Sequence, residues 1–162
     1  MSSTPNRASN PTGKTRRKDV NLDLPTARQM LPLIRSIVSD INTSRRAIEQ
    51  LTPEQERLDR HRRDLVWQER QRRYQVSDEL AAAEKSLTTA LTELSGLGVS
   101  LLDPEHGEVD FPTKINGRAA AFTWKIGDDG VGHWHYTGEQ QRRPIPAEWD
   151  NVVAAVRFRG QP

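Results

Sequence analysis

Two histidines on one predicted strand are the residues whose type and spacing come closest to a chemical site. His133 and His135 flank Trp134, and the alternation of a strand places both imidazoles on one face and the indole on the other. Two imidazoles about 7 Å apart can share a zinc, iron or manganese ion when a neighbouring strand supplies a third ligand. The candidates for that ligand are Asp110, Glu108 and His106. The same histidines are also consistent with structural hydrogen bonds or with the wall of a pocket for an organic ligand.

The composition excludes several classes of site and of protein. The chain has no cysteine, which excludes disulfides, thiol nucleophiles and thiolate zinc sites. Hydrophobic residues make up 34% and charged residues 28%, values that fit a helical element with a solvated outer face plus a small second lobe. No apolar run approaches the length of a membrane helix, and the first residues are polar. We therefore expect no membrane span, no signal peptide and a cytoplasmic location.

The N-terminal residues form a basic segment without periodic apolar positions. Residues 1–18 carry five basic side chains and no acidic one, which leaves a charge of −3 for residues 19–162. We expect residues 1–20 to be a disordered tail that is either simply solvated or makes a weak, salt-sensitive contact with nucleic acid. Ala8 to Thr15 (ASNPTGKT) ends like a phosphate loop, but the pattern contains neither the preceding strand nor the following helix that such a loop requires.

Two matching apolar patterns predict a long helical hairpin. In each pattern, apolar or small residues recur at alternating steps of four and three, which keeps them on one side of a helix. The first pattern comprises Met30, Ile34, Ile37, Ile41, Ser44, Ile48 and Leu51. The second comprises Val76, Leu80, Ala83, Leu87, Ala90, Leu94 and Leu97. Folded back antiparallel, the two seams pair position by position along arms of about 33 Å.

Helix-start signals suggest how the first arm is divided. Asp23 is a helix cap, and Pro25 follows in the first turn, where a missing N–H costs nothing. Pro32 lies inside the apolar pattern and predicts a kink or a restart. We expect the first arm to end near Leu51, because Thr52 to Gln55 has the residues of a new helix start.

Residues 52–75, at the closed end of the predicted hairpin, combine many arginines with two aromatic residues. We expect the chain to reverse near Arg63 and Asp64 and to be loosely packed there, because the two seams, if extended further, would pair polar residues. The helices either end with the seam or continue beyond it. This end is either a solvated, charged helix end or a surface that docks a partner through aromatic and guanidinium groups. The candidate partner-binding residues are Trp67, Arg70, Arg72 and Arg73. An under-packed end would also allow two copies of the chain to associate.

After the second arm, the sequence changes to short alternating runs typical of strands. We expect strands at residues 99–102, 108–111, 118–126 and 132–137, with the second stopping at Pro112. Asn116-Gly117 predicts a tight turn, and Pro146 predicts a short helix that carries Trp149, Val152, Val153 and Val156 on one side. The predicted fold is therefore α+β: a basic tail (1–20), a coiled-coil-like hairpin (21–98), a small antiparallel sheet at its open end (99–146), and a C-terminal helix and tail (147–162).

Several short motifs in a fixed order resemble a known family. They are Leu24, Ala27, Leu31-Pro32, Gly98-Val99, Gly107 to Pro112 (GEVDFP), Trp124 to Gly127 (WKIG), His133 to His135 (HWH) and Arg142 to Ile145 (RRPI). Over residues 22–146 the chain is similar to the bacterial proteins grouped as Domain of Unknown Function 2203, a name that implies no established activity. Thr123 stands where this resemblance leads us to expect a cysteine. Gly138 to Gln141 replaces an expected Phe-Ala-Gly segment, so a pocket closed by that loop would be altered here.

The resemblance points to a polar set on the predicted sheet, namely Asp110, Trp124, Lys125, His133, His135 and Arg143. Because alternate residues of a strand face opposite sides, these six residues do not all share one surface. We expect a ligand-binding site formed by Asp110, His133, His135 and Arg143. If a divalent metal is bound, its expected ligands are His133, His135 and Asp110.

The functional hypotheses follow from what these motifs contain. No nucleophile has a paired base at a recognisable spacing, and no metal motif is complete, so we assign no catalytic residue. The leading hypothesis is a non-enzymatic binding or scaffold protein whose hairpin binds a protein partner or a second copy of the chain. The alternative is a metal- or small-ligand-dependent enzyme centred on the strand of His133 and His135. A weaker alternative is an RNA- or ribosome-associated factor that uses the basic N-terminal segment.

Overall fold

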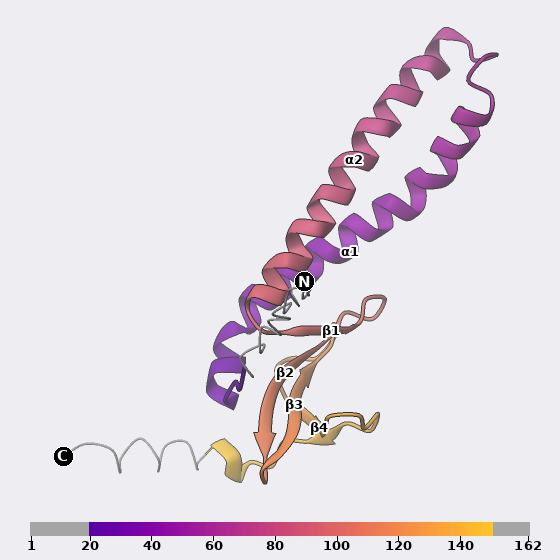
Figure 1. Ribbon diagram of the computed structural model, residues 1–162. Helices are drawn as coiled ribbons and strands as arrows, with labels where there is room; N and C mark the ends of the chain where they lie inside the picture. The colour runs from indigo at the N-terminus through magenta and orange to yellow at the C-terminus, as the bar shows by residue number, and fades with distance from the viewer. Residues whose placement is uncertain (1–19, 151–162) are drawn as a thin grey trace, which may run out of the picture.

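Two long helices followed by a five-stranded antiparallel sheet make up the computed structural model, which describes residues 20–150 (Figure 1). The helices are α1 (Leu24–Arg60) and α2 (Trp67–Gly96). The strands are β1 (Ser100–Asp103), β2 (Glu108–Ile115), β3 (Arg118–Trp124), β4 (His133–Tyr136) and β5 (Arg143–Pro144). This arrangement confirms the predicted α+β class with a helical hairpin. The basic segment at residues 1–18 lies outside the described residues, and no helix within residues 20–150 is long and apolar enough to cross a membrane.

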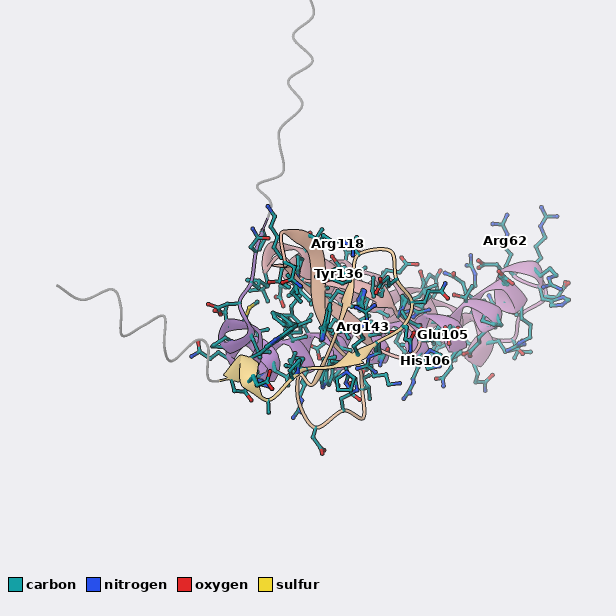
Figure 2. All side chains as sticks on the ribbon, turned by 90° about the horizontal axis from the view of Figure 1, so that it is seen from below. Arg62, Glu105, His106, Arg118, Tyr136 and Arg143 are labelled. Atoms are coloured by element: carbon teal, nitrogen blue, oxygen red, sulfur yellow. The ribbon has the colours of Figure 1, made fainter. Side chains whose placement is uncertain are left out.

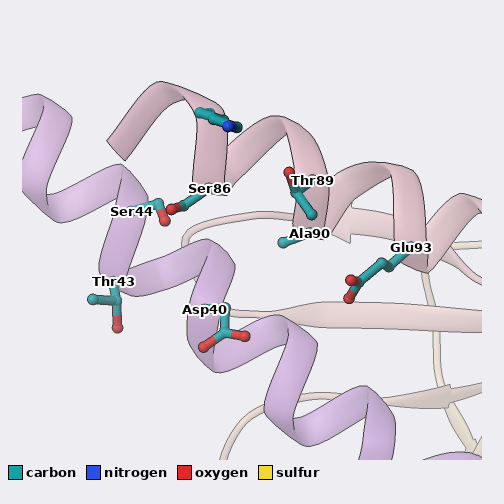
Figure 3. Close-up of a pocket in the computed structure, with 8 residues that line it drawn as sticks. Asp40, Thr43, Ser44, Ser86, Thr89, Ala90 and Glu93 are labelled. Carbon is teal, nitrogen blue, oxygen red and sulfur yellow. The ribbon is translucent and has the colours of Figure 1, made fainter. Parts of the chain in front are cut away.

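The seam that holds the two helices together is the one that the sequence predicts. Every position of both patterns is buried or half-buried, and Asp23 caps α1 by accepting a hydrogen bond from the Thr26 N–H at 2.8 Å. The seam is not uniformly large and apolar, because Ser44 is a buried polar residue and Ala90 a small one. Beside them a polar cleft of about 480 Å³ opens between the helices, and Figure 3 shows Asp40 on α1 and Glu93 on α2 among the residues that line it.

Helix α1 runs without interruption through both of its internal prolines, Pro32 and Pro53. Of the two outcomes expected at Pro32, a kink or a restart, the restart is therefore excluded, and the predicted helix end at Leu51 is wrong. Thr52 does not cap a new helix, because its hydroxyl instead donates to the Ile48 carbonyl one turn earlier, at 2.7 Å. Each proline removes one hydrogen bond, but the seam against α2 continues on both sides of it, and tertiary packing of that kind outweighs a local helix breaker.

The closed end of the hairpin, residues 57–74, is named the hairpin tip below. The chain reverses between Arg60 and Trp67, as expected, but the expectation of loose packing is wrong. Leu58 and Val76 are fully buried and form a second hydrophobic cluster with Leu65, against which Leu51 packs. Leu65 lies in the turn and closes the cluster from outside both helices, so the helical seam alone does not reveal it. Figure 2 shows how far this end, marked by Arg62, lies from the sheet.

The strands form a meander in the order β1-β2-β3-β4-β5, with every neighbouring pair antiparallel. Asn116 and Gly117 both have positive φ, of 53° and 75°, which forms the predicted tight turn between β2 and β3. Strand β2 does not stop at Pro112, contrary to the prediction. Strand β1 pairs with β2 only as far as Asp110, so Pro112 lies at an open edge where its missing N–H costs nothing, and its carbonyl accepts from the Leu22 N–H at 2.7 Å.

One face of the sheet packs against the open end of the hairpin and forms the main core. The sheet contributes Val109, Phe111, Phe122, Trp124 and Trp134, and the helices contribute residues from Leu24 to Ile41 together with Ala90 and Leu94. Residues 148–150 begin the predicted C-terminal helix, and Trp149 stacks at 5.3 Å from Trp134 while Asp150 forms an ion pair with Arg28. Val152, Val153 and Val156 lie outside the described residues.

Candidate functional site

The side of the sheet that faces away from the helices carries the polar residues; we name it the outer face. The strand register places Asp110, Thr123 and His133 side by side in one row, which ends at Pro144 of β5. The next row contains Pro112, Ala121 and His135. Both histidines thus share a face with Asp110, opposite to Trp134. Thr123 is fully buried at the centre of this face, at the position where the resemblance predicts a cysteine.

Asp110 and His135 form a buried pair on the outer face. The His135 Nε2 lies 2.7 Å from an Asp110 carboxylate oxygen, and its Nδ1 lies 2.9 Å from the Tyr136 carbonyl. A carbonyl oxygen only accepts hydrogen bonds, so Nδ1 carries a proton. The contact with Asp110 then requires one more proton, located either on Nε2 or on the carboxyl group. The pair therefore holds one shared proton and is neutral overall, which is how two buried titratable groups avoid a net charge.

The electrostatics of this pair agree with its geometry. Burial raises the pKa of Asp110, although the hydrogen bond with His135 opposes the change. Burial by itself lowers the pKa of His135, but the hydrogen bonds to Asp110 and to the Tyr136 carbonyl outweigh it and raise the pKa above its usual value. Both groups thus retain the shared proton to a higher pH than they would in water. The second oxygen of Asp110 is buried and has no hydrogen-bond partner, which adds to the cost of ionising the carboxyl group.

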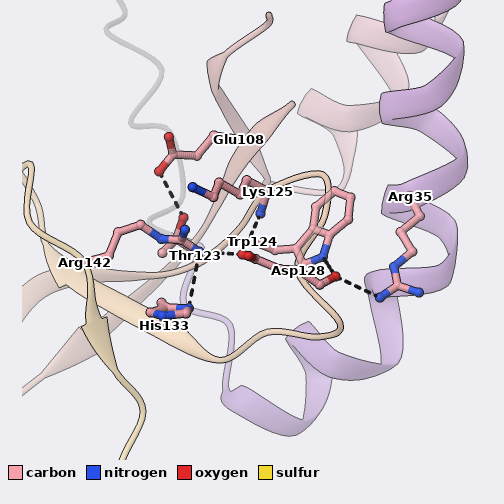
Figure 4. A network of polar contacts seen from close by, with 8 residues as sticks. All are labelled: Arg35, Glu108, Thr123, Trp124, Lys125, Asp128, His133 and Arg142. Atoms are coloured by element: carbon pink, nitrogen blue, oxygen red, sulfur yellow. Dashed lines mark hydrogen bonds and ion pairs between the residues drawn. The ribbon is translucent and has the colours of Figure 1, made fainter. Parts of the chain in front are cut away.

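His133 belongs to a second polar network, shown in Figure 4. Its Nδ1 lies 3.4 Å from the Arg142 guanidinium, which can only donate, so Nδ1 is the unprotonated ring nitrogen. Arg142 also donates to the Asp128 carboxylate at 2.6 Å, and the Lys125 backbone N–H donates to the same oxygen at 3.2 Å. Burial by itself raises the pKa of Asp128, but these hydrogen bonds outweigh it and hold the pKa below its usual value.

The network reaches the hairpin through the loop that follows β3. The Trp124 indole N–H donates to the Asp128 carbonyl at 3.0 Å, and Arg35 of α1 donates to the same carbonyl at 3.4 Å (Figure 4). A cleft of about 570 Å³ lies between α1 and this loop, lined by Arg35, Ser39, Asn42, Thr43, Arg46, Trp124 and residues 126–129. The outer-face histidines do not line this cleft. The network thus fixes the loop to α1 rather than opening a site at His133.

Arg143, which the sequence predicts in the site, lies on the other side of the sheet. It pairs in register with Trp134, and its guanidinium lies over the Trp134 and Tyr136 rings, at 5.0 and 5.4 Å from their centres. Figure 2 shows Arg143 near Tyr136 and Arg118. The arginine that meets the histidines is its neighbour Arg142, which the prediction of site residues omits.

The predicted metal ligands are not assembled into a coordination site. Both ring nitrogens of His135 are engaged in hydrogen bonds. His106 pairs with Asp103 at 2.6 Å in the turn before β2, and Glu108 lies 3.5 Å from the Thr123 hydroxyl. Across residues 20–150, no group of three histidine, aspartate or glutamate side chains is placed to hold a metal ion. The arrangement therefore gives no support to the metal hypothesis.

The hairpin tip carries large apolar and aromatic side chains that are exposed to solvent. Val66, Trp67 and Tyr74 are 58%, 62% and 68% exposed, which is unusual for large apolar side chains. Among the predicted partner-binding residues, Arg72 and Arg73 form ion pairs with Glu54 and Asp59 of α1 at 2.7 Å and so tie the two helices together. The side chains of the remaining tip arginines form no ion pair and no hydrogen bond within the described residues: they are Arg57, Arg60, Arg62, Arg63 and Arg70. The hydrogen bond with Arg72 lowers the pKa of Glu54, and the charge of Arg57 is near enough to lower it further.

Comparison with known proteins gives one positive result. Residues 22–145 match the family model described as "Uncharacterized conserved protein (DUF2203)", which confirms the resemblance seen in the sequence motifs. The match covers the hairpin, the whole sheet and the outer face, and it leaves out the basic N-terminal segment. No curated protein matches the chain, and no solved structure does.

Proposed function

The chain belongs to the DUF2203 family of uncharacterized conserved proteins, and we propose that it is a binding protein that presents its hairpin tip to a partner macromolecule. The observation that carries this proposal is the surface of the tip. Trp67 and Tyr74 are mostly exposed, and five arginines without a side-chain ion pair belong to the same end, which Leu58 and Val76 hold closed. Tryptophan, tyrosine and arginine are the residues that most often dominate binding interfaces.

The position of the tip also favours binding. Helix α2 has 30 residues, so the hairpin extends about 45 Å from end to end at 1.5 Å per residue, and Figure 1 shows it projecting away from the sheet. The second hydrophobic cluster stabilises a protruding end that contributes nothing to the main core. A closed, projecting end with exposed aromatic side chains is suited to reach a partner without involving the sheet.

The outer face supports the rival hypothesis of an enzyme less well. His135 uses both of its ring nitrogens in hydrogen bonds, and His133 accepts from Arg142, so neither histidine presents a group that is set to act as a base toward a cleft. A neutral pair whose histidine has both ring nitrogens hydrogen-bonded is typical of a structural polar cluster in a sheet. We therefore place the binding function at the hairpin tip and a structural role on the outer face.

Site-specific photo-crosslinking in the cells that make the protein tests this proposal. A benzoylphenylalanine is introduced at Trp67 or at Tyr74, both exposed, and at exposed Glu84 in the middle of α2 as the matched control. After irradiation, crosslinked species are separated and identified by mass spectrometry, before and after nuclease digestion. We expect one discrete adduct from the tip positions and none from Glu84.

Two outcomes would count against the proposal. Adducts that form equally from Glu84 and from the tip would mean that the protein contacts its neighbours non-specifically. A complete lack of adducts from both tip positions, with the protein folded and labelled, would mean that the tip does not engage a partner. The far-UV circular dichroism spectrum of each variant shows whether it is folded, and we expect this spectrum to match wild type because the substituted residues are exposed.

A further inference from the structure

We infer that the partner of the hairpin tip is a single-stranded nucleic acid, an inference that rests on the proposed binding function of the tip. The contacts would be made by stacking of bases on Trp67 and Tyr74 and by phosphates on the tip arginines. RNA and DNA offer the same two chemical groups, phosphates and base faces. The structure therefore points to single-stranded nucleic acid as the class of partner, and the experiment distinguishes RNA from DNA.

The charge of the tip is the first observation. Residues 57–74 contain seven arginines, no lysine and three acidic residues, which gives a net charge of +4. The acidic residues are Asp59, which is paired with Arg73, Asp64, and Glu69 in the first turn of α2. The five arginines whose side chains form no ion pair or hydrogen bond are therefore available at a projecting, solvent-exposed end. A planar guanidinium matches the phosphate group in geometry, so this charge complements a polyanion.

The placement of the two aromatic rings is the second observation. Trp67 and Tyr74 are seven residues apart on α2, so they lie on nearly the same side of the helix with a rise of about 10 Å between them. Stacked bases are only about 3.4 Å apart, so two bases that cover both rings have to be splayed from each other. Bases in a duplex are stacked and paired inside the helix, whereas a single strand can present separate base faces to separate rings.

Arg70 links the two observations, because it lies one turn after Trp67 between the two rings and has no partner within residues 20–150. It is placed to meet the backbone of a strand whose bases cover Trp67 and Tyr74. The first turn of α2 adds donors at the same end, since its N-cap Val66 has no side-chain oxygen to satisfy the free N–H groups. An acidic protein surface would complement the charge but has no feature that explains two exposed rings at this spacing.

Fluorescence anisotropy with the full chain tests the inference. The probes are fluorescein-labelled single strands of about 12 nucleotides, one RNA and one DNA of mixed sequence, and the duplex of the same length. We expect both or one of the single strands to bind more tightly than the duplex, with an affinity that falls as salt rises. Trp67→Ala should weaken binding roughly 5- to 150-fold, the range for loss of one base stack.

Matched substitutions separate the tip from general charge. Exchange of Arg62, Arg63 and Arg70 for Gln should lower the slope of log affinity against log salt by about 2, at about 0.7 per phosphate contact. The control exchanges Arg46, Lys85 and Lys114 for Gln, three exposed basic residues away from the tip that have no ion pair within the described chain, and should leave the slope close to wild type. Leu33→Ala, at a residue 51% exposed near the open end, controls for Trp67→Ala.

Three results would overturn the inference. The first is that neither single strand binds at low salt. The second is that the duplex binds as tightly as the single strands, since stacking on the rings would then contribute nothing. The third is that tip and control variants lose affinity equally. If, in addition, the photo-crosslinking at Trp67 captures a protein whose adduct resists nuclease, the binding function of the tip stands and only its assignment to nucleic acid fails.

Discussion

The second hydrophobic cluster makes the hairpin tip a unit whose stability can be changed separately from the rest of the protein. Leu58 is fully buried and is in contact with only a few other apolar residues, namely Leu65, Val76 and Leu51. None of these belongs to the main core at the open end of the hairpin. Leu58→Ala should therefore open the tip without unfolding the sheet or the remainder of the helices.

The expected size of the effect follows from the number of atoms removed and from their surroundings. Leucine-to-alanine exchange in a core lowers the free energy of unfolding by about 2 to 5 kcal/mol. Values in the lower half of this range occur where neighbouring groups can move in to fill the cavity. A cluster of four residues beside a solvent-exposed turn is such a place, so we expect about 2 to 3 kcal/mol. The exposed ion pairs of Arg72 and Arg73 contribute little to this balance. A loss of this size multiplies the open population of the tip by roughly 30 to 150.

Hydrogen exchange followed by mass spectrometry measures this population region by region. In Leu58→Ala, amides in residues 52–76 should exchange faster by roughly that 30- to 150-fold factor, while those of β2, β3 and the first half of α1 should not change. Ile34→Ala, at a fully buried residue of the main core, is the contrasting variant and should accelerate exchange throughout the molecule. The reasoning would be refuted if Leu58→Ala accelerated exchange equally in the sheet and in the tip, or if it left the tip unchanged.

The remaining predictions concern the sheet and can be checked by urea unfolding and NMR. Asp110→Asn should lower the pKa of His135, because the carboxylate that stabilises the imidazolium is lost; an unchanged ring titration in ¹⁵N NMR would argue against the shared proton. Between about pH 4 and 6.5 the unfolded chain also binds one proton on these two groups, so the contribution of the pair to the free energy of unfolding should be constant there. It should decline as the pH rises from about 6.5 through the raised folded pKa of His135, so that wild type and Asp110→Asn converge at high pH; a stability difference that grows with pH would contradict this. Gly107→Ala should destabilise the protein by about 1 to 3 kcal/mol, because φ is +63° and a Cβ there would lie 2.5 Å from Ile126 and 2.9 Å from Val38; a variant as stable as wild type would show that the backbone relaxes.

The helical part of the fold could be predicted from the sequence because its signal is long and periodic. Fourteen seam positions repeat over both arms, and a repeat of that length survives even a small polar member such as Ser44. The local signals at Pro32 and Thr52 pointed the other way and failed, since a helix breaker acts over one turn while the seam acts over the whole arm. The burial of Leu65 could not be predicted for a different reason. Its packing depends on the path of the turn between the helices, which no periodic pattern in the sequence describes.

The outer face could be predicted only as far as strand alternation reaches. Alternation alone places His133 and His135 on one side and Trp134 on the other. The register places Asp110 in the row of His133, and its carboxylate contacts His135 of the neighbouring row. The choice between Arg142 and Arg143 depends on how β5 pairs with β4 after a loop, and a slip of one residue moves every side chain to the opposite face. No feature of the sequence defines that register, which is why the prediction chose the wrong neighbour.

The edge strands of the sheet limit how copies of this protein can associate. The edge strand β5 has only two residues, one of them Pro144. The other edge strand, β1, has four residues and pairs with β2 only as far as Asp110. Beyond that point Pro112 of β2 has no N–H to donate, and its carbonyl already accepts from the Leu22 N–H. A strand of another molecule therefore has few free backbone N–H and C=O groups to pair with at either edge of the sheet. Polymerisation of the protein by strand addition is accordingly suppressed.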